Sequence, residues 1–227
     1  MEILFEDNHL IAINKPAGVL VQGDETGDVC LADMVKSYLK ERYGKPGNVF
    51  TGVIHRIDRP VSGVVLFAKT GKALTRLNEQ FKIRAIRKTY WAVVKNLPVP
   101  AEGNLLHYLI KDQGTNKSRA FNSEKHNAKK AEMYYRLVGQ SQSYALLEVK
   151  PVTGRHHQIR VQLAAIGCSI KGDLKYGFDR PNNDSSIHLH ARSITLIHPT
   201  LKTELTITAP VPNEPLWQIF ESLVQAS

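Results

Sequence analysis

Short strand-like and helix-like segments follow one another in this chain without a regular alternation, which limits the folds open to it. Apolar residues recur at the spacing of one helix face in residues 31–43, 73–83, 156–166 and 215–224. Strand-like runs occupy residues 2–13, 19–21, 49–54, 64–68, 89–94, 105–110, 118–122, 131–138, 144–149, 194–197 and 205–207. Because these segments form no regular βαβ series, we expect an α+β fold with a mixed, mainly antiparallel sheet.

The organisation of the chain predicts one domain over residues 1–227, because no repeat of fixed period, low-complexity tract or linker interrupts it. A continuous apolar run at Val64–Ala68 predicts a strand that is buried on both faces. Residues 98–131 are polar, basic and interrupted, so we expect a hairpin arm that need not pack tightly.

Charge is the most informative part of the composition. Thirty Lys and Arg residues against 21 Asp and Glu give a net charge of +9, which favours a nucleic-acid partner, although basic proteins are also common without one. No apolar stretch is long enough to span a membrane, and no signal peptide is visible. Two cysteines, Cys30 and Cys168, are too few for a disulfide framework or a zinc cluster, so we expect a cytoplasmic protein that is monomeric by default.

The motifs of common cofactor sites are missing. The sequence contains no phosphate-binding G-x-x-x-x-G-K-[ST] loop, no G-x-G-x-x-G after the first strand and no G-x-S-x-G elbow. His156 and His157 would point about 100° apart as neighbours on a helix, and His188 and His190 lack an obvious third ligand. We therefore expect neither a metal nor an organic cofactor.

A polar segment, His55–Gly63, separates two strand-like runs and contains one carboxylate among arginines. Asp58 lies between Arg56 and Arg59, and flanking cations favour the ionised form of a carboxylate. An ionised Asp on a loop that rigid strands hold can act as a nucleophile or a general base. An Asp–Arg pair that only closes a turn explains the same spacing, and the spacing alone favours that structural interpretation.

Two further segments combine features that suit RNA. Thr153–Arg160 runs from a strand through a glycine turn into a helix start, where exposed amides suit an anion, although it can also be a solvated basic helix start. Arg155 and Arg160 are five positions apart, so we expect them to have separate tasks. In Arg87–Ala92, basic residues adjoin aromatic rings that can stack on bases, or that simply pack within a strand.

Taken together and in this order, the segments resemble the RluA-type RNA pseudouridine synthases. The matching motifs are His-Arg-Ile-Asp-Arg-Pro-x-Ser-Gly from residue 55, Lys-x-Tyr-x-Ala from 88, Thr-Gly-Arg-x-His-Gln-Ile-Arg-Val from 153 and Gly-Asp-x-x-Tyr-Gly from 172. Residues 14–18 and 188–191 also look like that family. The resemblance runs from about residue 3 to residue 210, so we expect the catalytic domain alone, without an S4 domain.

The resemblance implies the pseudouridine synthase catalytic-domain fold, with flanking helices and a central cleft, and isomerisation of a specific uridine in structured rRNA or tRNA without a cofactor. It implies that Asp58 is the catalytic aspartate, that Tyr90 lies against the target base and that Arg160 pairs with the catalytic carboxylate. The expected RNA-contact residues are Arg56, Arg59, Arg87, Lys88, Arg155 and His157. The departures from the family pattern, which remove no reacting group, are Ile57, His156 and Gln162.

Several routes and functions stay open at this point. Asp58 could attack C1′ of the ribose, remove the C2′ proton or attack C6 of the base, and either Asp58 or Tyr90 could remove the C5 proton. A non-catalytic RNA-binding module would explain the charge and the aromatic residues, but not a lone acid beside arginines. A glycoside or nucleoside hydrolase would normally need a second carboxylate, for which Asp173 is the only candidate.

Overall fold

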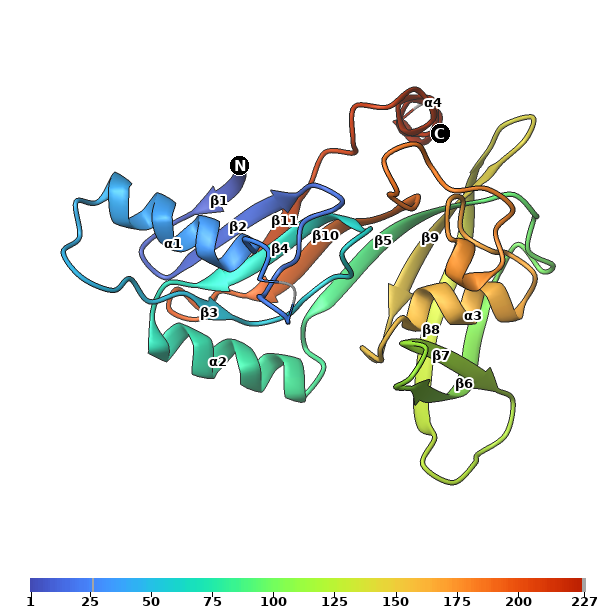
Figure 1. Ribbon diagram of the computed structural model, residues 1–227, viewed down its shortest axis with the longest axis horizontal. Coiled ribbons are helices and arrows are strands. Elements are labelled where there is room, and N and C mark those ends of the chain that lie inside the picture. Colours follow the sequence, from blue (N-terminus) through green and yellow to red (C-terminus); the bar gives the residue numbers. More distant parts are fainter. Residues whose placement is uncertain (26, 226–227) are drawn as a thin grey trace. The chain divides into compact units, whose positions relative to one another are not determined.

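The computed structural model describes residues 1–25 and 27–225, and this part of the chain forms four α-helices and mainly antiparallel strands (Figure 1). The expected α+β class is therefore confirmed. Contacts between Cα atoms divide the chain into two compact units. The first comprises Met1–Ile86 and Ala191–Pro210, and the second comprises Arg87–His190 and the chain from Val211 onward. That the whole chain acts as one catalytic domain stays a prediction.

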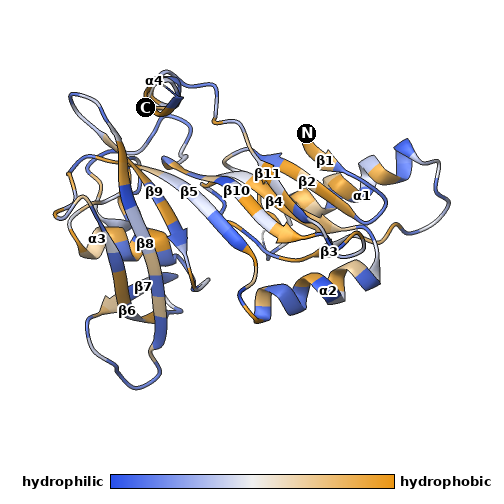
Figure 2. Ribbon diagram, turned by 180° about the vertical axis from the view of Figure 1, so that it is seen from behind, coloured by the Kyte–Doolittle hydropathy of each residue, from blue (hydrophilic) through white to orange (hydrophobic). Residues whose placement is uncertain are grey.

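The first unit is built around two buried strands. Its strands are β1 (Glu2–Glu6), β2 (Leu10–Lys15), β3 (Gly52–Val53), β4 (Ser62–Ala68), most of β10 (Leu189–Ile197) and β11 (Glu204–Thr208). β2 lies between β1 and β4, β10 lies beside β4, and β11 pairs with β10. Every residue of β4 is buried, which confirms the expectation from its apolar run, and Figure 2 shows β2 and β4 in largely hydrophobic colours.

Two amphipathic helices complete the first unit, and the sequence predicted both within two residues of their ends. They are α1 (Leu31–Arg42) and α2 (Gly71–Lys82). The buried face of α1 holds Leu31, Ala32, Val35 and Leu39. α2 begins after Thr70, whose hydroxyl oxygen accepts a backbone N–H of the first turn at 3.2 Å and so caps the helix.

The second unit contains a five-stranded antiparallel sheet. In spatial order its strands are β5 (Arg87–Val94), β9 (Ala145–Pro151), β8 (Lys129–Gln140), β6 (Glu102–Asp112) and β7 (Lys117–Phe121). The helical segments of this unit are α3 (Gln158–Ala165), the short 3₁₀ helix η1 (Leu174–Tyr176) and α4 (Pro215–Gln225). None of the helices in the described part of the chain has the length and apolarity that crossing a bilayer requires.

Two separate apolar clusters fix the helices of the second unit against its sheet. The α4 cluster consists of Trp91, Val93, Leu146, Val211, Trp217 and Phe220. The α3 cluster consists of Leu109, Ala131 and Val161, with Ala120 and Tyr176 packed against it. Burying one such large side chain stabilises a fold by about 1.5–3 kcal/mol, so each cluster is enough to hold its helix in place.

Residues 19–21 do not form the strand that their sequence suggested. The carbonyl oxygens of Leu20 and Val21 accept the backbone N–H groups of Leu31 and Ala32 at 2.7 and 3.1 Å. These carbonyls therefore satisfy the amides at the start of α1, which have no partner within the helix, and are not available to a neighbouring strand.

Residues 98–131 contain the expected hairpin, formed by β6 and β7, and it packs tightly although the sequence did not require this. β6 pairs with β8 from Glu102 to Leu109 and with β7 from Tyr108 to Asp112. Leu109 and Ser118 are buried, and α3 packs against both β6 and β7. The polar composition of this segment reflects strands with one exposed face, because side chains alternate between the two faces of a sheet.

Candidate active site

Asp58 lies on the loop between β3 and β4, directly before a strand that is wholly buried. Its carbonyl oxygen accepts the backbone N–H of Val61 at 3.1 Å, which closes a turn at the entrance to β4. Ile57 is buried and Arg56 is exposed, while the Asp58 side chain is partly exposed. The backbone around Asp58 is thus fixed, and the residue keeps some access to solvent.

A fully buried lysine holds this loop from the inside. Lys15 is 0% exposed, and its Nζ donates hydrogen bonds to the carbonyl oxygens of Pro16, Val19 and Arg59 at 3.0, 2.7 and 3.2 Å. Burial lowers the pKa of Lys15 to about 7; the negative charge of Asp58 opposes this shift, and the positive charge of Arg59 adds to it. Lys15 therefore ties the turn that follows β2 to the loop that carries Asp58.

Arg59 fastens the same loop a second time. Its backbone carbonyl accepts the N–H of Gly18 at 2.8 Å, and its Nε donates to the carbonyl oxygen of Gly18 at 2.9 Å. Its Nη2 lies 2.9 Å from a carboxylate oxygen of Asp28, in an ion pair that is about half exposed. These contacts give Arg59 a structural task, and its predicted contact with RNA stays a prediction.

The start of β4 comes so close to β10 that only glycine fits. Gly63 has a φ of +115°, and a Cβ at this position would lie 2.3 Å from the carbonyl oxygen of Ala191. A side chain would therefore collide with backbone atoms, which cannot move aside cheaply. The glycine that ends the His55–Gly63 motif is thus required by the approach of two strands.

In the second unit, Arg160 is held by a partner that the sequence did not suggest. Its Nε and Nη2 donate to the two carboxylate oxygens of Asp173 at 2.7 and 2.8 Å, and the exposed fractions of the two side chains are only 6% and 1%. The guanidinium carbon also lies 5.1 Å from the centre of the Tyr176 ring. A bidentate pair of this kind fixes the plane and direction of the guanidinium group.

Tyr176 connects this arginine to the neighbouring segments. Its hydroxyl oxygen accepts the backbone N–H of Ser118 at 2.8 Å and forms a hydrogen bond with Nδ1 of His157 at 2.9 Å. Burial raises the pKa of Tyr176, which keeps the hydroxyl protonated at neutral pH. The contacts of Tyr176 therefore fix β7, the start of α3 and η1 around the arginine.

The two histidines before α3 are not neighbours on a helix, contrary to the expectation from the sequence. Residues 156 and 157 precede the helix, and His157 adopts a left-handed conformation with a φ of +53°, so the two histidines are not helical neighbours. Their rings stack with centroids 3.8 Å apart, whereas helical geometry would point them about 100° apart. Nδ1 of His156 forms a hydrogen bond with the Ser118 hydroxyl at 2.9 Å. Within residues 1–25 and 27–225, no group of three His, Cys, Asp or Glu side chains could hold a metal ion.

Tyr90 lies on the face of its sheet that α3 covers. Tyr90 on β5 pairs directly with Val149 on β9, and Val149 pairs directly with Tyr135 on β8. Residues that are directly opposed on neighbouring strands point to the same face of the sheet, so these three side chains share a face. Tyr135 shares its face with Ala131, four positions earlier on β8, and Ala131 packs against Val161 of α3. The sheet thus presents Tyr90, which is partly buried, on the same side as the helix that carries the buried arginine.

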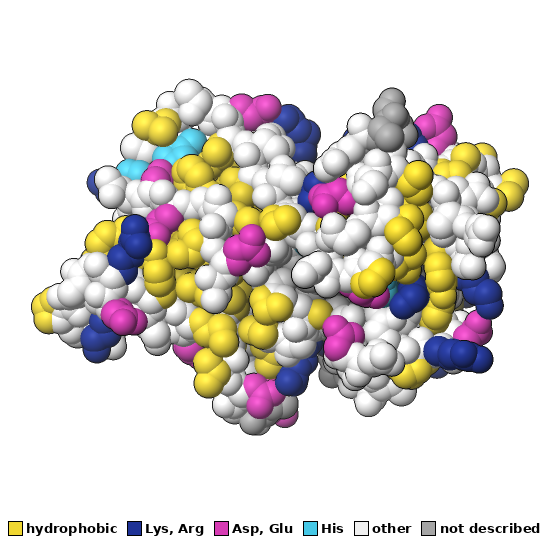
Figure 3. Space-filling model, turned by 90° about the horizontal axis from the view of Figure 1, so that it is seen from above, with side chains coloured by type: hydrophobic (Ala, Val, Ile, Leu, Met, Phe, Trp, Pro, Cys, Tyr) yellow, Lys and Arg dark blue, Asp and Glu magenta, His cyan; other side chains and the backbone are white. Residues whose placement is uncertain are grey.

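The predicted RNA-contact residues of the second unit differ in exposure. Arg87 is exposed at the start of β5, whereas burial lowers the pKa of Lys88. Arg155 donates from its Nε to the carbonyl oxygen of Lys130 at 3.0 Å. On the face drawn in Figure 3, Lys and Arg side chains are interspersed with Asp and Glu and form no continuous patch. Contact of these residues with RNA therefore stays a prediction.

The catalytic residues that the sequence predicted are divided between the two units. Asp58 belongs to the first unit, and Tyr90 and Arg160 belong to the second. A pair between Arg160 and Asp58 would join the units, so it stays a prediction. Sequence reasoning assigned no task to Lys15, beyond the resemblance of residues 14–18 to the family, and missed the partnership of Asp173 with Arg160. The only sequence signal for that partnership was an acid between two glycines, Gly172 and Gly177.

Comparisons with known proteins agree with one another. A profile of the family described as RNA pseudouridylate synthase matches residues 9–165. The chain is 33% identical over 213 residues to ribosomal large subunit pseudouridine synthase C of Rickettsia bellii, covering 93% of this chain and 68% of the relative. It is 30% identical over 230 residues to tRNA pseudouridine synthase C of Pectobacterium carotovorum, covering 92% of this chain and 58% of the relative.

Solved structures support the same assignment. The human RNA pseudouridylate synthase domain containing 4 protein aligns with a TM-score of 0.79 and 26% identity, over 99% of this chain and 93% of that chain. The human domain containing 1 protein has a TM-score of 0.76 at 22% identity, with the same coverage, which is a likeness of fold. Because the family profile covers most of the chain and relatives match almost all of it, the chain belongs to the RNA pseudouridine synthases, a family of isomerases.

Proposed function

We propose that this protein converts a uridine within rRNA or tRNA to pseudouridine, with Asp58 as the residue that acts on the nucleotide. The observation that carries the proposal is the fixed loop of Asp58. A partly exposed carboxylate stands at the head of the buried strand β4, and the buried Lys15 holds the backbone beside it. The family of the chain and the ribosomal and tRNA enzymes among its relatives support RNA as the substrate.

The target base has to leave the RNA stack before any group can reach its glycosidic bond. Extruding a base costs a few kcal/mol, which stacking on a ring and contacts to the backbone offset. Tyr90 supplies that ring in this proposal, because it is partly exposed on a rigid strand of the second unit. Arg56, which is exposed beside the Asp58 loop, contacts the RNA near the extruded nucleotide.

The reaction moves one bond within the nucleotide. The bond between C1′ and N1 breaks, the base turns, and C5 bonds to C1′, after which C5 loses a proton and N1 holds one. Asp58 begins the sequence by attack at C1′, by removal of the C2′ proton or by attack at C6, and each route requires an ionised carboxylate. The final proton passes from C5 to Tyr90 or Asp58. The reaction needs neither an oxidant nor an activated donor.

Arg160 pairs with the carboxylate of Asp58 and directs it in this proposal. Its pair with Asp173 uses Nε and Nη2, and a guanidinium group has five N–H donors in a planar fork. An arginine that is already fixed on one side can pair with a second carboxylate at a small entropic cost. Asp173 is then a positioning residue, because it acts through Arg160.

The structure weighs against the alternative of a hydrolase. Such an enzyme normally needs a second carboxylate, and the only sequence candidate was Asp173. That carboxylate is 1% exposed, and both of its oxygens accept hydrogen bonds from Arg160. A group held in this way is suited to orienting a neighbour rather than to activating water.

Release of tritium from RNA that contains 5-tritiated uridine tests the proposal. Ribosomal and transfer RNAs are transcribed with the labelled nucleotide, incubated with the full chain and assayed for labelled water and for free uracil. We expect tritium release without free uracil, and pseudouridine in the digested RNA. Free uracil would establish the hydrolase, and binding of these RNAs without tritium release would establish a non-catalytic RNA-binding module.

A further inference from the structure

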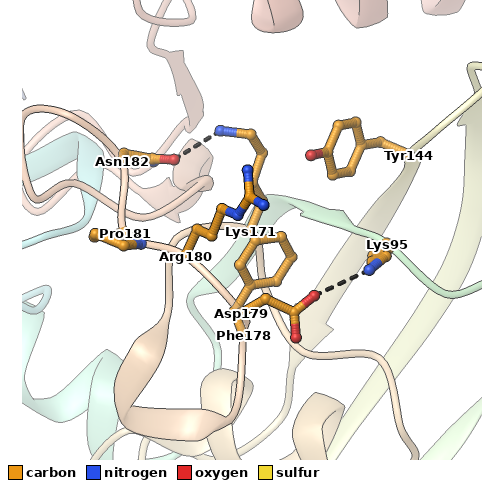
Figure 4. A pocket seen from close by; sticks show the side chains of 8 residues that line it. All are labelled: Lys95, Tyr144, Lys171, Phe178, Asp179, Arg180, Pro181 and Asn182. Carbon is orange, nitrogen blue, oxygen red and sulfur yellow. Dashed lines mark hydrogen bonds and ion pairs between the residues drawn. The ribbon is translucent and has the colours of Figure 1, made fainter.

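A concave site lies in the second unit, lined by residues that the proposed reaction does not use. Its volume is about 530 Å³, and Figure 4 shows the eight side chains that line it: Lys95, Tyr144, Lys171, Phe178, Asp179, Arg180, Pro181 and Asn182. We call it the Lys171 pocket. Its volume lies within the range of ordinary small-ligand sites.

The Lys171 pocket lies along β5 from Tyr90, because Lys171 bonds to Val93, three residues beyond Tyr90, and Lys95 is further on. Tyr90 and Lys95 are five residues apart, and β5 extends as far as Val94. At about 3.3 Å per residue along a strand, the two positions are about 16 Å apart. A ligand in this pocket therefore occupies a different place from the base that Tyr90 contacts.

The charge of the pocket favours an anion. Lys95, Lys171 and Arg180 contribute three positive charges, against Asp179 among the lining residues and the carboxylates of Asp184 and Glu214 near Lys171. Lys95 pairs with Asp179 at 2.9 Å, in an exposed ion pair. Arg180 is exposed, and within residues 1–25 and 27–225 its guanidinium group has no hydrogen-bond or ion-pair partner. Its donors are therefore available to a ligand.

Two partly buried aromatic residues line the same pocket. Phe178 directly precedes the exposed residues Asp179 and Arg180, and Tyr144 directly precedes β9. Tyr144 also packs against the α4 cluster, so its ring is held on one side by the core. Aromatic rings beside cations are the combination that binds single-stranded nucleic acid, because rings stack on bases while cations meet phosphates.

Hydrogen bonds of Asn182 hold the loop that forms one wall of the pocket. Asn182 accepts a hydrogen bond from Nζ of Lys171 at 2.6 Å and donates to the carbonyl oxygen of Ser186 at 3.0 Å and to Nδ1 of His188 at 2.9 Å. Burial lowers the pKa of His188 to about 3, so its ring is neutral and can accept this bond. Gly172 lets the loop approach, because a Cβ there would lie 2.8 Å from both Asn182 and Ser186.

We propose that the Lys171 pocket binds one unpaired nucleotide of the RNA strand that the enzyme modifies, at a position away from the reacting uridine. Its base stacks on Phe178 and Tyr144, and its phosphate pairs with Arg180 and Lys171. The assignment rests on the proposed function, because that function supplies the RNA. It gives the enzyme a second contact with the substrate, which adds affinity without touching the reacting base.

Photo-cross-linking locates the nucleotide. The probe is an oligouridine of about a dozen residues, long enough for an ordinary single-strand site, in which 5-iodouridine replaces some uridines. It is irradiated with the full chain, and the linked peptides are identified by mass spectrometry. We expect links at Phe178 or Tyr144 in addition to any at Tyr90. Links confined to Tyr90, or to residues outside the pocket, would overturn the proposal.

Binding measurements with matched variants give a second readout. Phe178→Ala removes a stacking ring, and we expect oligouridine to bind at least about fivefold more weakly. Arg180→Ala removes one phosphate partner, and the slope of log affinity against log salt should fall by about 0.7. Arg136→Ala, an exposed arginine of the same unit that does not line this pocket, is the control and should leave binding unchanged. Equal effects of Arg136→Ala and Arg180→Ala would contradict a specific site.

These results separate the pocket from the proposed reaction. Cross-links in the pocket without tritium release from any RNA would support nucleotide binding in the pocket and reject the proposed activity. Tritium release that the Phe178→Ala and Arg180→Ala variants leave unchanged at limiting RNA, together with unchanged binding, would reject the pocket and uphold the activity. Uridine monophosphate that competes as tightly as the oligomer would point to a free nucleotide and would also overturn the assignment to RNA.

Discussion

The ion pair between Arg160 and Asp173 allows a quantitative test of how the second unit is held together. Replacing Asp173 with Asn keeps the size of the side chain but removes its charge and one acceptor. The two side chains are 6% and 1% exposed, so the arginine would lose a buried counter-charge. Removing one partner of such a pair typically costs about 3–5 kcal/mol. In a chain of this length, that corresponds to a fall in Tm of about 6–20 °C.

A double-mutant cycle isolates the interaction itself. The free energy of unfolding is measured by urea denaturation for the native chain, for Asp173→Asn, for Arg160→Met and for the double variant. Because the double variant contains neither charge, it should recover much of the stability that each single variant loses. The exposed pair Arg136–Glu148, whose arginine is 59% exposed, is the matched control and should show a coupling below about 1 kcal/mol. A coupling between Arg160 and Asp173 no larger than that of the control would refute this reasoning.

Three further predictions concern other positions. Tyr90→Phe keeps the ring but removes the hydroxyl, and we expect an unchanged fold; a loss of turnover of about 10²–10⁴, the range of proton-transfer catalysis, would assign the C5 proton to Tyr90, and native turnover would assign it to Asp58. Lys15 has a pKa of about 7 in the folded chain against 10.5 as its ordinary value, so the unfolded state binds more protons between these pH values. The stability of the native chain relative to Lys15→Met should therefore rise by about 1.4 kcal/mol per pH unit in that window, and parallel curves would contradict this. Gly63→Ala should destabilise the chain by more than about 3 kcal/mol, because its Cβ would meet the Ala191 carbonyl oxygen; a urea midpoint equal to that of the native chain would disprove the steric argument.

Local sequence patterns predicted the regular elements well. The apolar run of β4 and the helical spacing of α1, α2 and α4 depend on residues within the element itself, and the structure confirms them. Residues 19–21 have an equally strand-like pattern, but their carbonyl groups bond to the start of α1 and to Lys15. Such competition for backbone groups comes from distant parts of the chain, so a local pattern could not reveal it.

The sequence predicted which residues belong to the candidate site, but not which of their side chains pair. The sequence marked the polar segments that contain Asp58 and Arg160, and its resemblance to the RluA-type synthases gave both residues their roles. It did not reveal that Arg160 pairs with Asp173, since these residues are thirteen positions apart and meet only because the chain turns back between α3 and η1. The start of α3 was placed two residues early, because the left-handed backbone of His157 is a tertiary feature stabilised by the hydrogen bond of its ring to Tyr176.

The proposed reaction depends on the carboxylate of Asp58, and the variant Asp58→Asn shows whether it does. This change keeps the size of the side chain and removes the negative charge that every proposed route requires. Tritium release from 5-tritiated uridine in RNA and the affinity for the same RNA are measured on the same preparation. We predict that tritium release falls to the background without protein, while RNA affinity stays unchanged and the chain remains folded. Release at the native rate by Asp58→Asn would contradict the account.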